Sequence, residues 1–326
     1  MGTVSTLLAI AASSCSVFAG QAPYQEGRKV GQVQSPLIAE VSGLVASRRQ
    51  PGVLWVHNDS GDAPRVYAIN PKGDLLAVFV VSGAQARDWE DIAIGPGPDP
   101  STDYLYLGDI GDNNGRHPSV VVYRVKEPAV DPNRRGLEGR TDPAADSISL
   151  VYPDGPRDAE ALLVDPLTRD IYVISKRDLF SRVYGAKDPL SLSQTNKLEL
   201  VCLLPWGVAT GGDVSPDGKK VIVRSMYWAS LWDRDPNKPL WQAFRGTAWT
   251  IPLAAEPQGE AIGFDSRGRG YYTISEGKNP SIYYFAPAET GHWNNLGSSC
   301  MRGQHRFPEY HGQRLLEAGP ARTARR

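Results

Sequence analysis

The sequence has little that would direct the protein to nucleic acid, into a membrane or into a helical fold. Its 35 basic and 36 acidic residues nearly cancel, so no overall field favours an anionic partner, and we expect no nucleic-acid partner. Beyond the first nineteen residues no apolar run approaches the roughly 20 residues of a membrane helix, and we expect no membrane span. Helical periodicity is nearly absent, which excludes a helical solenoid.

Cysteine and known nucleophile motifs are also scarce. There are three cysteines, Cys15, Cys202 and Cys300, and either a disulfide between the last two or two separate thiols fits the sequence. No Gly-x-Ser-x-Gly elbow is present, and none of the five histidines lies in a recognisable triad setting. These absences argue against a serine hydrolase site.

The ends of the chain differ from its middle. Residues 1–19 combine an apolar stretch, a serine-rich segment and a small-residue end at Ala19, which predicts a signal peptide and a secreted, extracellular protein. Residues 20–293 form the expected β domain. Residues 294–326 are rich in Gly, Arg and His, and we expect a mobile C-terminal tail.

What the chain does have is a repeat built from short strands and turns, with 33 Gly and 26 Pro. Similar strand phrases begin at Ser42, Glu90, Glu160, Gly212 and Glu260. A period of about 50 residues or more that is filled with strands predicts the four-stranded antiparallel blades of an all-β propeller. Five blades are favoured, with six as the alternative.

The closure of the ring is also predicted. The fifth repeat lacks a fourth strand, whereas a strand-like segment at residues 29–33 precedes the first repeat. Pairing of the two would remove the open edges of the ring. Residues 127–146, rich in Pro, Arg and Asp, are expected to form a long surface loop, unless they hide a degenerate strand.

Acidic residues recur where the innermost strands begin, at one end of the expected central funnel. Carboxylates that converge repel one another unless a cation neutralises them, and oxygen-rich loops without Cys or His clusters suit calcium. The predicted calcium ligands are Glu90, Asp91, Glu160, Asp213 and Glu260, assisted by Asn58, Asp59, Asp109 and Asp112. Each of these residues could instead bind backbone N–H groups or a neighbouring arginine.

Basic residues are expected at the same end of the funnel. Lys176, Arg177, Arg224 and His57 follow second strands of the repeats and are the predicted substrate-binding residues. A metal beside basic groups suits an anionic substrate, because the metal polarises oxygens that the basic groups bind. Charge balance with the carboxylates, and for His57 a structural role next to Trp55, are the alternatives.

Several of these phrases resemble a family of secreted bacterial and fungal propellers, some of which are named for a phytase-like esterase activity. The resemblance is carried by His57-Asn58-Asp59-Ser60-Gly61-Asp62, by Asp88-Trp89-Glu90-Asp91-Ile92-Ala93 and by Gly259-Glu260-Ala261-Ile262, and it spans residues 38–286. Similarity to calcium-dependent propeller phytases would imply calcium and phosphate-ester hydrolysis in the funnel.

The leading functional hypothesis is a monomeric, calcium-binding hydrolase of the phosphoesterase type that acts on an anionic small molecule or glycan. A non-catalytic propeller that binds protein or carbohydrate is the first alternative. A lactonase-like or lyase-like enzyme is the second.

Overall fold

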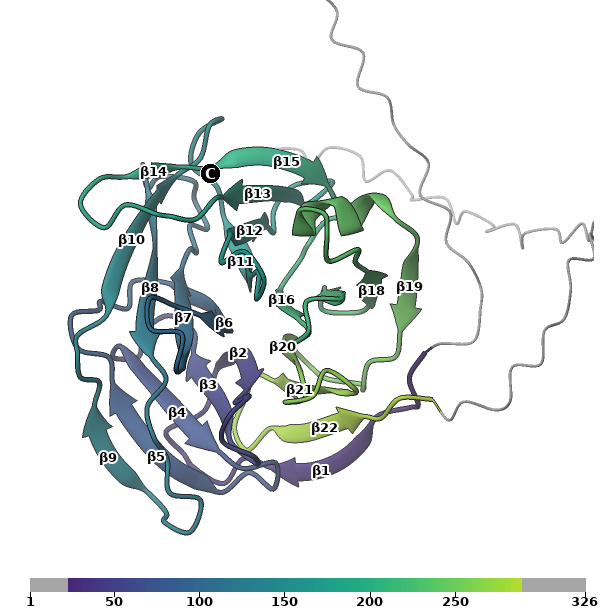
Figure 1. The fold of residues 1–326 in the computed structure, drawn as a ribbon. Helices are drawn as coiled ribbons and strands as arrows, with labels where there is room; N and C mark the ends of the chain where they lie inside the picture. Colours follow the sequence, from purple (N-terminus) through teal and green to yellow (C-terminus); the bar gives the residue numbers. More distant parts are fainter. Residues whose placement is uncertain (1–22, 289–326) are drawn as a thin grey trace, which may run out of the picture. The chain divides into compact units, whose positions relative to one another are not determined.

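The computed structural model describes residues 23–288, and these form a β-propeller of five blades (Figure 1). The predicted signal peptide and the whole of the predicted tail lie outside the described residues, as does Cys300. Five innermost strands stand around one axis and contact one another in the ring order β2, β6, β11, β16, β20 and back to β2. The predicted fold class and the favoured blade number are therefore confirmed.

Blades 1 and 2 each carry an additional outer strand. Blade 1 contains β2 (Val41–Ala46), β3 (Leu54–Asn58), β4 (Arg65–Ile69), β5 (Leu75–Val80) and β9 (Leu137–Arg140). Blade 2 contains β6 (Trp89–Pro96), β7 (Asp103–Asp109), β8 (Val120–Lys126), β10 (Asp146–Val151) and β14 (Asn196–Lys197). Strand β9 lies within residues 127–146, so this segment is a connection that adds a parallel strand to blade 1 rather than a plain loop.

Blades 3 and 4 have four strands each. Blade 3 contains β11 (Ala159–Val164), β12 (Ile171–Ser175), β13 (Arg182–Ala186) and β15 (Glu199–Leu203). Blade 4 contains β16 (Gly211–Val214), β17 (Lys220–Arg224), β18 (Ala229–Asp233) and β19 (Ala248–Ile251). One short 3-10 helix, η1 (Leu240–Arg245), is the only helix among the described residues, and none there is long and apolar enough to cross a membrane.

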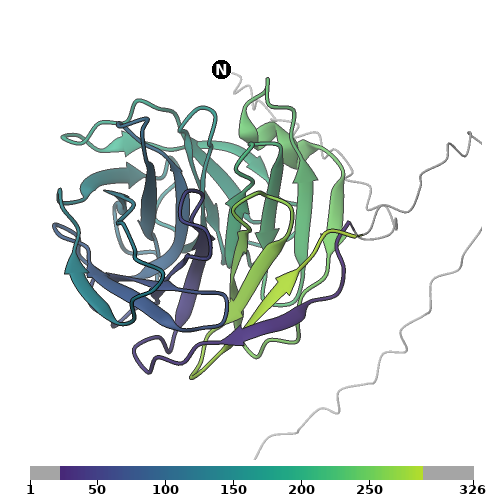
Figure 2. The same cartoon turned by 60° about the horizontal axis from the view of Figure 1, so that its bottom comes forward.

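Blade 5 closes the ring with strands from both ends of the domain. It contains β20 (Gly259–Phe264), β21 (Tyr271–Ser275), β22 (Ser281–Phe285) and the N-terminal strand β1 (Arg28–Gln32). Strand β1 pairs antiparallel with β22, and Figure 2 shows the two lying side by side at the rim. The predicted closure by the N-terminal strand is confirmed.

The apolar core lies between neighbouring blades. Trp55 of β3 and Trp89 of β6 belong to one buried cluster that joins blades 1 and 2, and comparable clusters join the other blades. Every residue of β2, β11 and β20 is buried, because an innermost strand is covered on both faces. This packing holds the beginnings of the innermost strands in fixed positions.

Candidate functional site

Local β-bulges direct the acidic side chains of the innermost strands. In β6, β11 and β20 the pairing register shifts by one residue, and the extra residue is Glu90, Glu160 or Glu260. A bulge leaves one residue outside the regular ladder and turns its side chain. Ser42 occupies the same position in β2, whereas β16 pairs with β17 without a bulge and has no corresponding residue.

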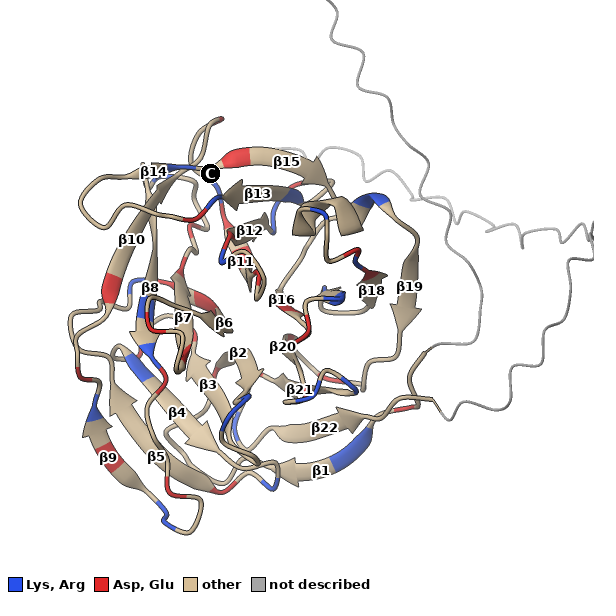
Figure 3. Ribbon diagram, viewed as in Figure 1, with Lys and Arg blue, Asp and Glu red and all other residues tan. Residues whose placement is uncertain are grey.

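The three glutamates meet with further carboxyl groups at one end of the propeller axis. We call this group the acidic cluster, and Figure 3 shows acidic residues bordering the centre of the ring. Its members are Asp59, Asp88, Glu90, Asp158, Glu160, Glu260, Glu276 and one cation, Lys176. Asp59 comes from the loop after β3, and Lys176 and Glu276 follow β12 and β21.

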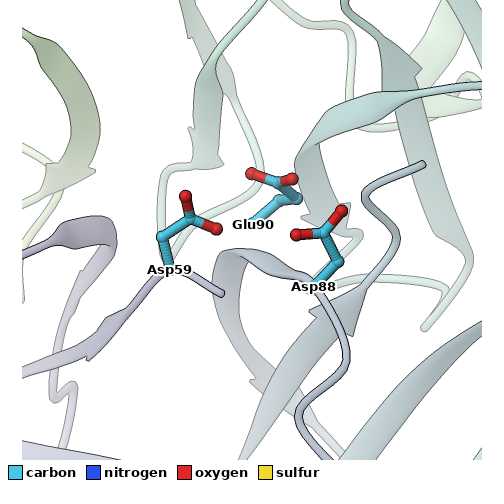
Figure 4. A group of neighbouring side chains, drawn as sticks. All are labelled: Asp59, Asp88 and Glu90. Atoms are coloured by element: carbon cyan, nitrogen blue, oxygen red, sulfur yellow. The ribbon is translucent and has the colours of Figure 1, made fainter. Parts of the chain in front are cut away.

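Two subgroups of carboxylates have the spacing of a cation site. One oxygen from each of Asp59, Asp88 and Glu90 lies within 4.8 Å of the other two, and Figure 4 shows these three side chains pointing toward one another. Glu90, Asp158 and Glu160 form a second group with the same spacing. Glu90 belongs to both, so it is the centre of the arrangement.

Glu90 is buried, and no counterion lies within ion-pair distance of it in the described part of the chain. Glu90 is 3% exposed, and its carboxylate forms no hydrogen bond or ion pair within residues 23–288. Burial, followed by the charges of Glu160, Asp59 and Asp88, raises the pKa of Glu90 far above its usual range. Burial and neighbouring aspartates also raise the pKa of Asp88 to about 6. The charged form of the cluster therefore lacks sufficient positive charge.

Lys176 supplies the positive charge inside the cluster. Its Nζ forms an ion pair with Glu160 and lies 3.7 Å from Glu260 Oε1. Burial lowers the pKa of Lys176, but Glu160 and Glu260 outweigh this effect and the net shift is upward. Burial raises the pKa of Glu276 to about 9, and the hydrogen bond with Glu260 and the charge of that residue contribute to the shift.

Arg177 lies at the edge of the acidic cluster. Its side chain is 55% exposed, its Nε donates to Asp158 Oδ2 at 2.6 Å, and it also contacts the amide oxygen of Asn113. These residues and Asp112 line a shallow hollow of about 220 Å³. A ligand at the cluster can therefore reach Arg177 from solvent.

Two other predicted calcium ligands, Asp91 and Asp213, lie on innermost strands but accept hydrogen bonds from backbone N–H groups. Asp91 accepts hydrogen bonds from the N–H groups of Ile92, Leu162 and Gly212, which belong to three different blades. Asp213, one position deeper in its strand, accepts from Val214 and Phe264. Burial raises the pKa of both carboxyls. Asp91 and Asp213 thus connect innermost strands and are not members of the acidic cluster.

The remaining predicted calcium ligands stabilise loops. Asn58 accepts from the N–H groups of Ala39 and Glu40. Asp109 Oδ1 accepts from the N–H of Asp88 at 2.7 Å and so positions that member of the cluster. Asp112 accepts from the N–H groups of Arg116 and His117, as in a turn closed by its own side chain. The structure brings none of the three into the two groups with cation spacing.

Two predicted substrate-binding residues are buried away from the cluster. Arg224 is fully buried and donates to Glu256 Oε2 at 2.9 Å and to the carbonyl of Ala261 at 3.1 Å. His57 is also fully buried, with Nδ1 2.8 Å from the carbonyl oxygen of Asn58, and burial lowers its pKa. Neither ring nor guanidinium is placed to contact a ligand from solvent.

Asp88, Asp158 and Glu276 join the cluster although they were not among the predicted ligands. A signal for the first two is present in the sequence, because Asp88-Trp89-Glu90 and Asp158-Ala159-Glu160 share an Asp-x-Glu pattern. Residues two apart at the start of a strand point to the same side. Glu276 has no comparable signal, since it follows β21 in a loop.

The chain was also compared with known proteins. No family model matches the sequence, and no curated protein matches it.

Proposed function

We propose that the acidic cluster binds a divalent cation, calcium, and that the loaded site hydrolyses an ester of an anionic small molecule or glycan. Glu90, Asp59 and Asp88 would hold the ion, with Asp158 and Glu160 as further ligands. All five offer only oxygen, which is the donor set that calcium prefers. Secretion, suggested by residues 1–19, would expose the site to millimolar calcium, which is the range of extracellular modules.

The observation that carries this proposal is the uncompensated burial of Glu90. A buried carboxylate without a partner is costly, and either a proton or a cation must neutralise it. With Asp59 and Asp88 oxygens within 4.8 Å, a single divalent ion would contact three carboxylates and offset two of their three negative charges. The acidic members of the cluster outnumber its one lysine, so the donor set fits a cation.

The bound ion would polarise a phosphoryl or carboxyl oxygen of the substrate. Arg177, which is exposed at the edge, is placed to bind an anionic group of that substrate. Lys176 would hold Glu160 and Glu260 in place, and Glu276, whose pKa is raised by burial and by Glu260, would carry a proton beside the site.

Metal binding is tested first. Calorimetric titration of the chelator-treated protein with calcium, with metal analysis after gentle purification, should show one calcium site. Glu90→Gln should weaken it by at least tenfold, whereas Asp131→Asn, at an exposed site outside the cluster, should leave it unchanged. An unchanged affinity in Glu90→Gln, or no calcium binding at all, would refute the proposal.

Hydrolysis is tested with a panel of phosphate monoesters, carboxyl esters and lactones. The charge of the site gives the lactones a specific reason to be included. Lys176 and Arg177 are already paired with carboxylates. In the metal-free site the remaining carboxylates would therefore repel a phosphate ester but not an uncharged lactone. Turnover that disappears with chelator and in Glu90→Gln supports the hydrolase. Calcium binding without turnover of any ester supports a binding propeller.

A further inference from the structure

An exposed apolar surface lies beside the acidic cluster. Its members are Leu179, Phe180, Val208, Tyr227 and Trp228, which are 84%, 48%, 44%, 79% and 38% exposed. We call this surface the platform. It contains half of the large apolar side chains that are exposed in residues 23–288. Such a concentration at one place is typical of a binding surface rather than of scattered surface residues.

The platform is continuous although three loops contribute to it. The backbone of Gly207 packs directly on the carbonyl oxygens of Asp178 and Leu179, so the loop before β16 lies against the loop after β12. The rings of Trp206 and Trp228 are 5.9 Å apart, and those of Tyr227 and Trp228 are 6.5 Å apart. These contacts join the three loops of blades 3 and 4 into one surface.

The platform is also rigid. The hydroxyl of Ser225 accepts hydrogen bonds from the N–H groups of Tyr227 and Trp228. The backbone N–H of Ser225 donates to the Trp228 carbonyl at 2.8 Å. Val208 has a φ of 66°, which a β-branched residue rarely adopts. Its N–H donates to the carbonyl of Lys176 at 3.0 Å. Strained backbone of this kind is concentrated at binding and active sites.

The same contact places the platform next to the acidic cluster. The backbone carbonyl of Lys176 accepts the hydrogen bond from Val208, and its Nζ forms ion pairs with Glu160 and Glu260. Arg177 follows in the chain and precedes the platform residues Leu179 and Phe180. The platform therefore adjoins the cluster at Lys176 and Arg177.

We propose that the platform is a carbohydrate subsite, on which a sugar ring of the substrate packs against Tyr227 and Trp228. This inference rests on the proposed function only for the location of the reacting group. Sugars present apolar C–H faces and hydroxyls that both donate and accept, which matches exposed aromatic rings on a surface that adjoins the polar segment Lys176 and Arg177. Five side chains are few for a stable protein interface, which takes about 20 to 30 residues a side.

The subsite is tested by binding, without turnover. Tryptophan fluorescence and calorimetry would follow short cello-, xylo-, chito- and galacturono-oligosaccharides added to the full chain, with calcium and with chelator. At least one of these should bind, and Tyr227→Ala and Trp228→Ala should each weaken it by tenfold or more. Leu167→Ala, an exposed leucine outside the platform, is the control and should leave affinity unchanged.

The outcomes separate this inference from the proposed function. Oligosaccharide binding that survives in Glu90→Gln, while calcium binding is lost, supports the subsite and tests it independently of catalysis. The inference is overturned if no oligosaccharide binds, or if Tyr227→Ala and Trp228→Ala bind like the parent. It is also overturned if these variants instead abolish a concentration-dependent self-association in light scattering, because the platform would then contact a second copy.

Discussion

Lys176 Nζ lies 3.7 Å from Glu260 Oε1, although the two residues belong to blades 3 and 5, on either side of blade 4. The contact is possible because β16 has no bulge and no glutamate at its start. Lys176 fills the side of the cluster that blade 4 leaves without a carboxylate. The cluster thus has four acidic sides and one basic side.

Replacement of Lys176 by methionine is expected to change stability and calcium affinity in opposite directions. Without the ammonium group, Glu160 and Glu260 lose their counterion, and the metal-free protein should lose roughly 2–4 kcal/mol at a pH of about 9, above the pKa of Glu160 of about 8. Calcium affinity should rise, because one repelling charge is removed. Chemical unfolding and calcium titration measure the two effects. Lys126→Met, at an exposed ion pair, should change neither, and weaker calcium binding in Lys176→Met would contradict the expectation.

The metal-free protein is expected to lose stability as the pH rises from about 5 to about 8. The pKa of Asp88 is raised to about 6 and that of Glu160 to about 8, so both groups keep their protons in the folded state after the unfolded chain has lost them. The folded state then binds more protons, and each further rise in pH favours unfolding. Carboxyls with lowered pKa values, such as Asp265, act below this window.

Thermal unfolding in chelator across this pH range measures the effect. Glu90→Gln removes a carboxyl whose pKa is raised far above its usual range by burial and by its acidic neighbours, so the melting temperature of the variant should depend less on pH. At pH 8 the variant should melt about 2 °C or more above the parent, which corresponds to about 1 kcal/mol in a domain of this size. A flat pH profile for the metal-free parent would rule out the charge distribution described for the cluster.

The fold could be predicted from the sequence because each blade repeats one local pattern of alternating strands and tight turns. The closing strand was predictable for the same reason, since Arg28–Gln32 has a strand pattern and the fifth sequence repeat has no fourth strand of its own. The site was harder to predict. A bulge inserts one residue, so Asp91 and Asp213 look equivalent in the sequence but lie at different depths, and both hold backbone N–H groups instead of joining the cluster.

Asp91→Asn should reduce stability without affecting the proposed metal site. Asp91 accepts N–H groups from three blades, and an amide has one acceptor oxygen where the carboxylate has two. A loss of roughly 2 kcal/mol is expected from the backbone groups left without a partner. Calcium titration well below the melting temperature should give the parent affinity. A large loss of affinity in the folded variant would assign Asp91 to the metal site after all.

A basic residue in the sequence also does not reveal whether its side chain is buried or exposed. Arg224 has the spacing of a residue at the end of a second strand, as Lys176 nearly does, but its guanidinium is enclosed by Glu256 and the carbonyl of Ala261. The partner, Glu256, comes from the loop before β20, and no local pattern links it to Arg224. The difference arises from tertiary packing between blades 4 and 5.

Arg224→Met is therefore expected to act on folding. It leaves Glu256 buried and unpaired, which costs roughly 3–5 kcal/mol. The double variant Arg224→Met with Glu256→Leu should recover part of this loss, because no unpaired charge remains. Chemical unfolding of the two variants and of Glu256→Leu completes the cycle. If the double variant loses as much stability as the two single variants together, the ion pair does not couple the two positions.

Gly111 gives the sharpest test of where the cation binds. A Cβ at this position would overlap the carboxylates of both Glu90 and Asp88, so Gly111→Ala must push these groups apart. Since the backbone there does not have a positive φ, an alanine meets no conformational strain of its own. Calcium affinity should fall by tenfold or more. Asn114→Ala, an exposed change in the same loop, should leave it unchanged. If Gly111→Ala binds calcium like the parent, the ion is not held between Glu90 and Asp88, and the group of Glu90, Asp158 and Glu160 becomes the remaining location for it.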